Sequence, residues 1–498
     1  MIILVYPRTG IEVGGAIAPP FGVMFAASIL NKENYEIKII DQRVDKKWKS
    51  NLDRELQKNP VCVGFSTMTG AQIGFALDIA KYVREKTDAP LIWGGSHPTI
   101  LPQQTLENKY VDIVVRAEGE QSLYEIVKAL EKDKSLNDIK GISYKEKHKI
   151  IHNPDRSPMN MEEVPDTPWE LINAEDYIFD SLYLRNSPRT LDIGETSRGC
   201  PNRCIFCCNS AIKRHFWRPM SAKRATEKIR YAVEKFKLDG IWIRDDNFYV
   251  DMKRVIDICK NISDLDIKWY TAGTCISTFN RIDDKSMKIL KRSGCDCLKF
   301  GGESGNDRIL KMIRKNQTRE DIIKSNLKCK KYDIISAYAF MIGFPTETYE
   351  EMLDTVSVIK RIKHDYPEAI IDAVNMVTPH YGTELYKIIK EEYSDLYSFI
   401  EPKKLEDWIS FSFIGENKQV WFDEKMRKRI QNISDTSVYM ENVSRLLDSV
   451  ENSAERLLLK TGMYLPEKYF QFKWNHNLFG YDPTIKVMRL IRKLWLNY

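Results

Sequence analysis

Residues 197–210, SRGCPNRCIFCCNS, decide how the rest of this chain is interpreted. They place Cys200, Cys204 and Cys207 in a C-x3-C-x2-C arrangement, in a loop that also carries a glycine and a proline. Thiolates this close in sequence can converge on one metal site, and a [4Fe–4S] cluster is normally held by four cysteines. Three ligands therefore predict a cluster with one iron left open for a substrate or cofactor.

A zinc knuckle is the alternative interpretation of this loop, built on Cys204 and Cys207 and completed by Cys208 or His215. Structural zinc usually takes two ligand pairs separated by a spacer. The sequence has no second C-x2-C pair. The spacing therefore favours the open iron–sulfur cluster.

The composition is that of an ordinary globular protein. The chain has 498 residues, of which 43% are hydrophobic and 29% charged, a length that allows about three domains. A net charge of +6 is mild for this length and does not indicate a nucleic-acid partner. No stretch approaches the length of an apolar membrane span, and the first residues lack a signal-peptide pattern. We expect a cytoplasmic protein, where closely spaced cysteines bind metals rather than form disulfides.

Strands alternate with helices over residues 1–140, which predicts a doubly wound, Rossmann-like parallel sheet. Ligands of such sheets bind beyond the carboxyl ends of the strands. The expected helices are 22–30 and 71–86, and the expected strands are 2–6, 36–41, 61–65, 90–93 and 111–115.

Residues 141–185 are expected to form a short hairpin followed by a proline-rich linker, and the same strand–helix alternation resumes over 186–390. Six such repeats predict a partial (β/α)6 TIM-type barrel with its functional loops at the carboxyl ends of the strands. The expected barrel strands are 190–196, 240–244, 267–272, 297–301, 334–341 and 370–377.

The cysteine loop resembles that of the radical S-adenosylmethionine (radical SAM) enzymes, because Arg198-Gly199 precedes the first cysteine and Phe206 precedes the third. The resemblance implies that the three cysteines are metal ligands and catalytic. It also implies that the open iron binds S-adenosylmethionine and that the cluster cleaves it reductively to a 5′-deoxyadenosyl radical. A protein reductant such as flavodoxin or ferredoxin would supply the electron.

The ends of the later barrel strands resemble the parts of this family that bind S-adenosylmethionine. Each motif alone is weak, since an acidic pair is often a cap and a Gly-x-Pro is often a turn. Carboxylates suit an ammonium or a vicinal diol because they accept hydrogen bonds. By this resemblance the residues that contact the cofactor are Phe206, Asp245, Asp246, Glu303, Ser304, Gly343 and Pro345.

The loops of residues 1–140 resemble the cobalamin (B12) domain that many radical SAM enzymes carry. Asp41 is followed by Gln42 and Arg43, so the histidine that ligates cobalt in some such domains is missing. The alternative is a docking module without a cofactor, and His97 is interpreted as a loop histidine satisfied by hydrogen bonds. The implied cobalamin contacts are Pro7, Asp41, Ser66, Thr67, Gly94, Gly95, Glu118 and Gly119.

Residues 391–498 are expected to form a mostly helical, aromatic-rich domain, with helices at about 423–433 and 438–459. No C-x-x-C pair occurs there, which argues against an auxiliary cluster. The basic amphipathic tail, 484–498, is interpreted as a helix packed on the protein, and peripheral contact with an anionic membrane is the alternative. Six further cysteines are expected to pack as small hydrophobic residues, at positions Cys208, Cys259, Cys275, Cys295, Cys297 and Cys329.

Three functions remain open at this point. The first is a cobalamin-dependent radical SAM methyltransferase that acts on an unactivated carbon or phosphorus of a small molecule. The second is a radical oxidative cyclase of the anaerobic magnesium-protoporphyrin ester type, which would share the order of domains. The third is a non-enzymatic iron–sulfur electron carrier, against which the loops after several strands count, because a carrier needs no nucleoside pocket.

Overall fold

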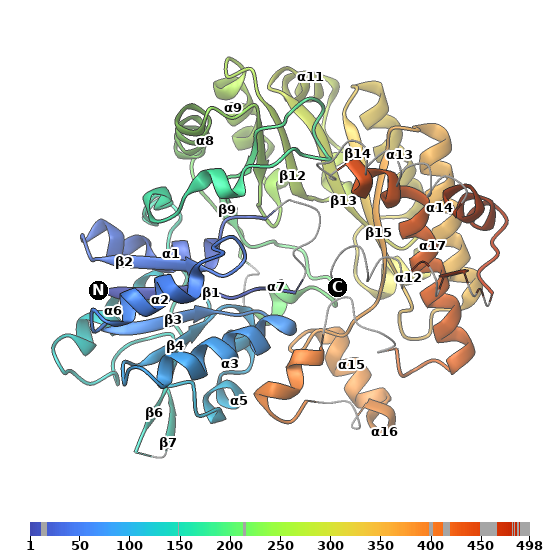
Figure 1. The fold of residues 1–498 in the computed structure, drawn as a ribbon. Helices are drawn as coiled ribbons and strands as arrows, with labels where there is room; N and C mark the ends of the chain where they lie inside the picture. Colours follow the sequence, from blue (N-terminus) through green and yellow to red (C-terminus); the bar gives the residue numbers. More distant parts are fainter. Residues whose placement is uncertain are drawn as a thin grey trace.

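The computed structural model describes residues 1–10, 17–147, 149–212, 216–397, 402–411, 419–448, 466–480, 482, 484–485 and 488. Two α/β lobes lie side by side, and the short helix α7 (Cys208–Ala211) of the cysteine loop lies between them (Figure 1). Each lobe is built on one sheet, and the predicted fold class is confirmed.

The first lobe contains a seven-stranded sheet in the order β2-β1-β3-β4-β5-β6-β7. Strands β1 to β5 are parallel, and the hairpin β6–β7 continues the sheet in the antiparallel sense. The hairpin expected at the start of the linker therefore extends this sheet. The strands are β1 (Ile2–Tyr6), β2 (Ile37–Asp41), β3 (Cys62–Ser66), β4 (Leu91–Gly94), β5 (Ile113–Val115), β6 (Ile142–Glu146) and β7 (Lys149–His152).

Helices cover both faces of this sheet. Buried side chains of α1 and α6 form one core with one face, and those of α2 and α3 form a second core with the other. Strands buried on both faces read as continuous apolar runs, as in IILVY of β1. The helices are α1 (Phe21–Lys32), α2 (Trp48–Leu56), α3 (Ala71–Arg84), α4 (Ser96–Ile100), α5 (Pro102–Glu107) and α6 (Glu120–Leu130).

The second lobe contains six parallel strands in the order β15-β14-β13-β12-β11-β8, which is chain order and leaves the barrel open between β8 and β15. A two-stranded antiparallel ribbon, β9 (Ser197–Arg198) with β10 (Arg218–Pro219), flanks the cysteine loop. The barrel strands are β8 (Thr190–Asp192), β11 (Gly240–Ile243), β12 (Lys268–Thr274), β13 (Cys295–Glu303), β14 (Ile335–Ile342) and β15 (Ile370–Met376).

The helices between the strands cover the outside of the barrel. Two of them, α13 and α14, begin with capping boxes, Thr318 with Asp321 and Thr348 with Glu351, which fix where each helix starts. The barrel helices are α8 (Ala222–Phe236), η3 (Phe248–Val250), α9 (Met252–Ile262), α10 (Ile276–Phe279), α11 (Asp284–Arg292), α12 (Asp307–Met312), α13 (Arg319–Lys331), α14 (Tyr349–Asp365), α15 (Glu384–Glu392) and α16 (Ser394–Tyr397).

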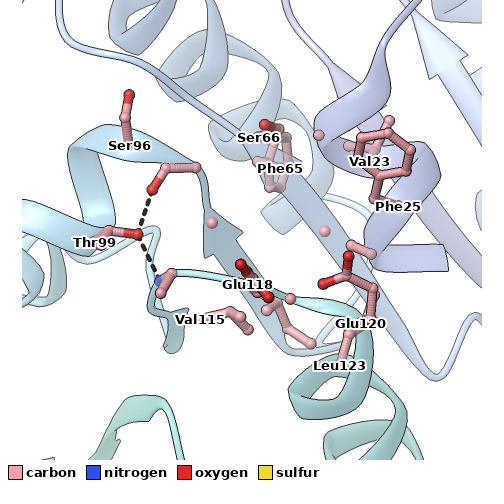
Figure 2. Close-up of a pocket in the computed structure, with 18 of the residues that line it drawn as sticks. Val23, Phe25, Phe65, Ser66, Ser96, Thr99, Val115, Glu118, Glu120 and Leu123 are labelled. Carbon is pink, nitrogen blue, oxygen red and sulfur yellow. Dashed lines mark hydrogen bonds between the residues drawn. The ribbon is translucent and has the colours of Figure 1, made fainter. Parts of the chain in front are cut away.

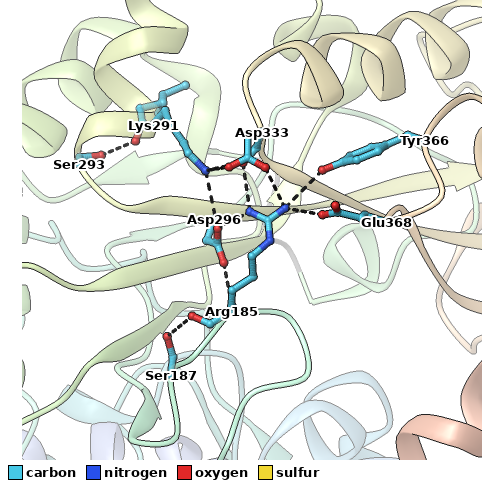
Figure 3. A network of polar contacts seen from close by, with 9 residues as sticks. Arg185, Ser187, Lys291, Ser293, Asp296, Asp333, Tyr366 and Glu368 are labelled. Carbon is cyan, nitrogen blue, oxygen red and sulfur yellow. Dashed lines mark hydrogen bonds and ion pairs between the residues drawn. The ribbon is translucent and has the colours of Figure 1, made fainter.

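The linker, which contains η1 (Trp169–Leu171) and η2 (Ala174–Tyr177), is fastened to the amino end of the barrel by Arg185 (Figure 3). The Arg185 guanidinium lies 2.9 Å from the Asp296 carboxylate, 3.1 Å from Asp333 and 2.7 Å from Glu368. Lys291 pairs with the same Asp333 carboxylate at 2.9 Å. These acids come at or just before the starts of β13, β14 and β15, so the network holds the edge opposite to the cysteine loop and stabilises the fold.

The C-terminal region contacts both lobes. The short helix η4 (Leu405–Ser410) packs on α3, and the Trp408 indole donates a hydrogen bond to the Gln104 carbonyl oxygen. One long helix, α17 (Glu424–Asp448), packs against β15 and runs through the break expected between two helices. Residues 449–459 of the expected second helix lie outside the described residues.

Most of the amphipathic tail also lies outside the described residues. Ile485 and Met488 are described and buried, which supports the interpretation that the apolar face of the tail packs on the protein. Among the described residues, we find no helix that combines the length and apolar character of a membrane span.

Candidate active site

The cysteine loop is positioned by carboxylates from the next strand. Asp245, which follows β11, is 2% exposed and accepts hydrogen bonds from the Thr196 amide at 2.5 Å, the Thr196 hydroxyl at 2.9 Å and the Ser197 hydroxyl at 2.5 Å. Asp246 accepts a hydrogen bond from the Gly199 amide at 2.9 Å. Both acids therefore hold the start of the loop, and their predicted contact with S-adenosylmethionine stays a prediction.

The three predicted ligands, Cys200, Cys204 and Cys207, are half-buried at the carboxyl edge of the barrel. Burial raises the pKa of Cys204 and Cys207 to about 11 and also raises the pKa of Cys200. The thiols also raise one another's pKa, so they lie within electrostatic range of each other. A metal centre that binds here would displace the protons, because the thiolate is the ligand.

Among the described residues, no group of three His, Cys, Asp or Glu side chains is arranged to hold a single metal ion. A zinc ion would need its donors at about 2.0–2.3 Å from one point. His215, one proposed member of that knuckle, lies outside the described residues. A four-iron cluster offers a different iron to each thiolate, so this all-cysteine donor set fits a [4Fe–4S] cluster.

Glu303 forms an ion pair that the sequence did not reveal. Its carboxylate lies 2.7 Å from the Lys315 ammonium, and the two side chains are 11% and 15% exposed. Glu303 adopts a positive φ of 61°, and a Cβ added at Gly301 would come within 2.1 Å of the Glu303 carboxylate. Glycine at 301 therefore leaves room for this pair in its observed place, and the pair provides both a cation and an anion beside Cys204.

The predicted nucleoside turn is braced from within the protein. The amides of Gly343 and Phe344 donate to one Glu347 carboxylate oxygen at 2.6 and 2.9 Å, and the Trp421 indole donates to the Gly343 carbonyl at 3.1 Å. Burial raises the pKa of Glu347 to about 8. Phe206 of the loop meets Phe344 edge to face, with ring centroids 6.5 Å apart.

Two more residues that were predicted to contact S-adenosylmethionine, Pro345 and Ser304, are buried in the protein. Pro345 is buried in the same turn. Ser304 is fully buried, and its hydroxyl lies 3.4 Å from that of Thr355. The structure therefore brings the turn and the loop together through Phe206, while Ser304 packs behind the strand end.

Cys259, Cys295, Cys297 and Cys329 are fully buried, as predicted. The prediction that Cys275 packs as a small hydrophobic residue is wrong. Its half-buried sulfur lies 3.1 Å from the Ser277 hydroxyl and accepts from the Asn202 side chain at 3.6 Å.

The pKa of Cys275 is lowered overall. Burial opposes the charge, but hydrogen bonds from Ser277 and the Thr278 backbone and the nearby Lys315 outweigh it. Cys208 is also only half-buried, at the start of α7, and burial raises its pKa to about 11.

A cavity of about 300 Å³ opens at the carboxyl edge of the first sheet (Figure 2). It runs from Leu4 and Ile92, in the middle of their strands, to Ser66 and Gly94 at the strand ends. A Cβ added at Gly94 would lie in ordinary van der Waals contact with Val115, whose carbonyl oxygen would be its nearest neighbour at 3.7 Å. A deep, mostly apolar cavity with small residues at its mouth fits the nucleotide tail of a cobalamin.

The predicted cobalamin residues divide into two groups. The cavity is lined by Ser66, Gly94, Gly95, Glu118 and Gly119. The other three, Pro7, Asp41 and Thr67, do not line it.

Two of the three predicted residues outside the cavity, Asp41 and Pro7, form polar contacts within the protein. The Asp41 carboxylate pairs with Arg43 at 2.7 Å and accepts from the Tyr177 hydroxyl at 2.8 Å. Pro7 accepts through its carbonyl from the Gln72 side chain. Thr67 is 1% exposed, and its hydroxyl oxygen has no hydrogen-bond partner.

His97 does not line this cavity. Its Nδ1 lies 3.0 Å from the Thr69 hydroxyl, and its ring meets Trp408 edge to face with centroids 5.4 Å apart. Burial lowers the pKa of His97 to about 3, which keeps the ring neutral. The interpretation of His97 as a loop histidine satisfied by hydrogen bonds holds only in part. His97 lies in the short helix α4, its Nδ1 is hydrogen-bonded, and its Nε2 has no hydrogen-bond partner.

The cysteine loop closes the cavity of the first lobe. Arg198 and Ile212, which flank the three cysteines, both line the cavity. The Arg198 guanidinium lies 2.7 Å from Glu120 and 3.3 Å from Glu118 and also pairs with Glu195. Arg218 pairs with Glu118 from β10, so a buried ionic network joins the lobes where the two predicted cofactor sites meet.

Comparison with known proteins agrees with both halves of the site. Residues 195–359 match the family described as the radical SAM superfamily, and residues 7–127 match the B12 binding domain. The chain is 34% identical over 395 residues to an uncharacterized methyltransferase of Pyrococcus horikoshii, covering 78% of this chain and 82% of that protein.

Two further proteins are similar over most of the chain. The anaerobic magnesium-protoporphyrin IX monomethyl ester cyclase of Cereibacter sphaeroides is 24% identical over 420 residues, which cover 80% of this chain and 66% of the cyclase. The fold matches the cobalamin-dependent S-adenosylmethionine radical enzyme OxsB, solved with aqua-cobalamin and S-adenosylmethionine, with a TM-score of 0.73 at 19% identity. That match covers 99% of this chain and 74% of OxsB.

Proposed function

This chain belongs to the radical SAM superfamily, in the group that carries a B12 binding domain, and from this premise we propose how its sites work together. It is a radical SAM enzyme that cleaves S-adenosylmethionine reductively at a [4Fe–4S] cluster and uses cobalamin for methylation. The acceptor we propose is an unactivated carbon, or phosphorus, of a small-molecule substrate. A flavodoxin or ferredoxin would deliver the electron.

The observation that carries this proposal is the shared boundary of the two cofactor sites. Arg198 lies two residues before Cys200 and also lines the cavity of the first lobe. Transfer of a group between two bound cofactors and one substrate requires that both cofactors open onto the same space. The Arg198 network supports this arrangement because it fixes the cysteine loop directly against the cavity.

We propose that Cys200, Cys204 and Cys207 hold the cluster and that the cavity beside Ser66 and Gly94 holds the tail of cobalamin. When bound, the cluster supplies the electron that cleaves S-adenosylmethionine, and cobalamin supplies the methyl group. The protein holds these groups in place and keeps bulk water from the radical.

The chain offers complementary charges for the amino-acid end of S-adenosylmethionine. The Lys315 ammonium can bind its carboxylate, and the Glu303 carboxylate can bind its ammonium or ribose hydroxyls. In the free protein the charges of Lys315 and Glu303 neutralise each other. When S-adenosylmethionine binds, its carboxylate and ammonium would take over these contacts, so neither buried side chain is left without an opposite charge. The Phe344 turn, braced by Glu347, is the predicted neighbour of the adenine.

The cyclase remains the second candidate because a magnesium-protoporphyrin ester cyclase is similar over most of this chain. Methylation is favoured because a methyltransferase is similar at higher identity and over more of its own length. The electron-carrier alternative is set aside, since the family is shown to be enzymatic.

Anaerobic reconstitution tests the proposal. The full chain, loaded with iron, sulfide and cobalamin, is incubated with S-adenosylmethionine and a low-potential reductant, and products are quantified by chromatography. We expect both 5′-deoxyadenosine and S-adenosylhomocysteine. 5′-Deoxyadenosine alone would favour cyclisation, and the absence of both would overturn the proposal.

The Cys204→Ala variant is the control for the cluster assignment. It is expected to lose the brown iron–sulfur absorbance together with 5′-deoxyadenosine formation, while keeping cobalamin in the other lobe. Retained absorbance and cleavage would show that Cys204 is not a ligand.

A further inference from the structure

Cys275 approaches the predicted cluster site from a different strand. It follows β12 directly, at the carboxyl edge of the barrel, and its side chain is half-buried. Its sulfur accepts a hydrogen bond from the Asn202 side chain at 3.6 Å, and Asn202 lies between Cys200 and Cys204. The Cys275 thiol therefore lies against the loop that carries the three predicted ligands.

Cys275 also shares charged neighbours with those ligands. The Lys315 ammonium interacts electrostatically with both Cys204 and Cys275, and Cys200 interacts with Cys275. The five buried cysteines, Cys62 among them, by contrast lie in the hydrophobic core. Cys275 is thus a fourth thiol at the same site, contributed by a separate element of the barrel.

An independent observation shows that this site is built for a ligand. Asn247, which follows β11, is 3% exposed and donates from its side-chain nitrogen to the Cys200 sulfur at 3.7 Å. Its side-chain oxygen is buried beside Cys200 without any hydrogen-bond partner. A buried unpaired oxygen costs about 1–3 kcal/mol, so it indicates a site whose partner arrives with a bound group.

We propose that Cys275 is the fourth protein ligand of the cluster in the enzyme free of S-adenosylmethionine. Its thiolate would bind the iron that Cys200, Cys204 and Cys207 leave open, because thiolate is the preferred ligand of iron–sulfur clusters. S-Adenosylmethionine then displaces it. This inference rests on the proposed function, since it requires the cluster.

The exchange involves no electron transfer. The bond between the Cys275 sulfur and the open iron would break as the amino nitrogen and a carboxylate oxygen of S-adenosylmethionine take its place. The proton that the S-adenosylmethionine ammonium loses on binding would pass to the released Cys275 thiolate. An internal ligand of this kind protects the exposed iron between turnovers and competes with the incoming cofactor.

The test compares the reconstituted full chain with the Cys275→Ala and Cys275→Ser variants, with Cys208→Ala as the matched control. Cys208 is also half-buried and adjacent to the predicted ligands, but it belongs to the first turn of α7 rather than to a barrel strand end. Three quantities are measured without turnover: iron per chain, the rate at which mild oxidation produces the EPR signal of a [3Fe–4S] cluster, and the dissociation constant of S-adenosylmethionine.

We expect both Cys275 variants to assemble the cluster, to lose the fourth iron faster and to bind S-adenosylmethionine more tightly. If the thiolate-bound form makes up about nine-tenths of the free enzyme, its removal tightens binding about tenfold. Cys208→Ala is expected to match the wild type. Serine keeps the shape of cysteine, so Cys275→Ser guards against a folding defect in the alanine variant.

Unchanged oxidation rates and unchanged affinity in both variants would overturn the inference, because Cys275 would then be a bystander. Weaker binding would also overturn it, because Cys275 would then contact S-adenosylmethionine rather than compete with it. A wild-type chain that takes up no iron–sulfur cluster would instead overturn the proposed function itself.

Discussion

The Arg198 guanidinium lies 2.7 Å from the Glu120 carboxylate, and both side chains are only 2% exposed. Arg198 belongs to the cysteine loop of the barrel, and Glu120 begins helix α6 of the first lobe. Carboxylates around Arg198 raise the pKa of its guanidinium although burial opposes the charge, so it stays protonated. This pair therefore holds the cysteine loop against helix α6 of the first lobe, where the two proposed cofactor sites meet.

Replacing Arg198 by methionine is expected to destabilise the protein strongly. The substitution leaves Glu120 buried without its cation, and breaking a buried pair by removing one partner costs about 3–5 kcal/mol. Urea unfolding followed by tryptophan fluorescence measures the loss as a lower midpoint. Lys428→Met removes an exposed pair on α17 and is the control, with an expected cost of about 0.3–0.5 kcal/mol. Equal effects of the two variants would contradict the structural role of Arg198.

Gly94→Val is expected to block cobalamin binding without unfolding the first lobe. Gly94 is a strand residue at the mouth of the cavity, with its nearest neighbour, the Val115 carbonyl, 3.7 Å from an added Cβ. A branched side chain fits a strand but fills the cavity.

The readout is the visible absorbance of cobalamin retained after desalting, which we expect to fall about tenfold or more, a loss of about 1.4 kcal/mol of binding. Gly480→Val is the control, because Gly480 is exposed and a Cβ added there would have no atom within 4 Å. Full retention by Gly94→Val would show that cobalamin binds elsewhere.

Asp245→Asn is expected to prevent cluster assembly. The Asp245 carboxylate accepts three hydrogen bonds, from the Thr196 amide and from the Thr196 and Ser197 hydroxyls. The NH₂ group of an asparagine side chain cannot accept a hydrogen bond, so at least one of these three donors loses its acceptor. Each buried donor left unpaired costs about 1–3 kcal/mol, so the start of the cysteine loop shifts. Iron and sulfide per chain after reconstitution are expected to fall below those of the wild type.

Asp246→Asn is the matched comparison, because an amide oxygen can still accept the single hydrogen bond from Gly199. We expect it to keep more iron than Asp245→Asn. The reverse order would show that Asp246, rather than Asp245, controls the loop.

Glu347→Gln is expected to change how stability depends on pH. Burial raises the pKa of Glu347 to about 8, far above its ordinary value of 4.5. Between these two values the unfolded chain releases the proton while the folded chain retains it, so the wild type loses stability as pH rises through this window. The slope is at most about 1.4 kcal/mol per pH unit, and it ends above pH 8.

Glutamine stays neutral, and its carbonyl oxygen can still accept from the Gly343 and Phe344 amides. The variant is therefore expected to match the wild type near pH 5 and to exceed its stability by a few kcal/mol at pH 8.5. Urea midpoints at both pH values measure the difference. A difference that does not change with pH would mean that Glu347 is ionised in the folded protein at neutral pH.

Much of the fold could be predicted from periodicity. Strands such as β1, which is buried on both faces, are continuous apolar runs, and α3 begins at the residue expected from its pattern. The order of the six barrel strands follows the chain, so local strand–helix alternation was enough to predict an open barrel. The expectation of two separate helices in this region was wrong, because α17 is continuous. Its packing against β15 stabilises the helix across residues whose own helix propensity is weak.

Only some residues of the candidate site could be predicted from the sequence. The spacing of Cys200, Cys204 and Cys207 predicted a cluster loop because ligands close in sequence must be close in space. Lys315 and Asn247 carry no such signal, since a single lysine in a loop between two helices or an amide after a strand is common. Their contacts bring Lys315 to Glu303 at the end of β13, and Asn247, after β11, to Cys200.

The sequence by itself determined the two folds, the cysteine loop and the family resemblance, since each depends on residues that are near one another in the chain. Only the tertiary structure decided which of these residues meet. It paired Arg198 with Glu120 across 78 positions and brought Cys275 against Asn202 across 73. Such contacts depend on how the lobes pack and how the barrel curls, and these long-range arrangements have no local pattern in the sequence.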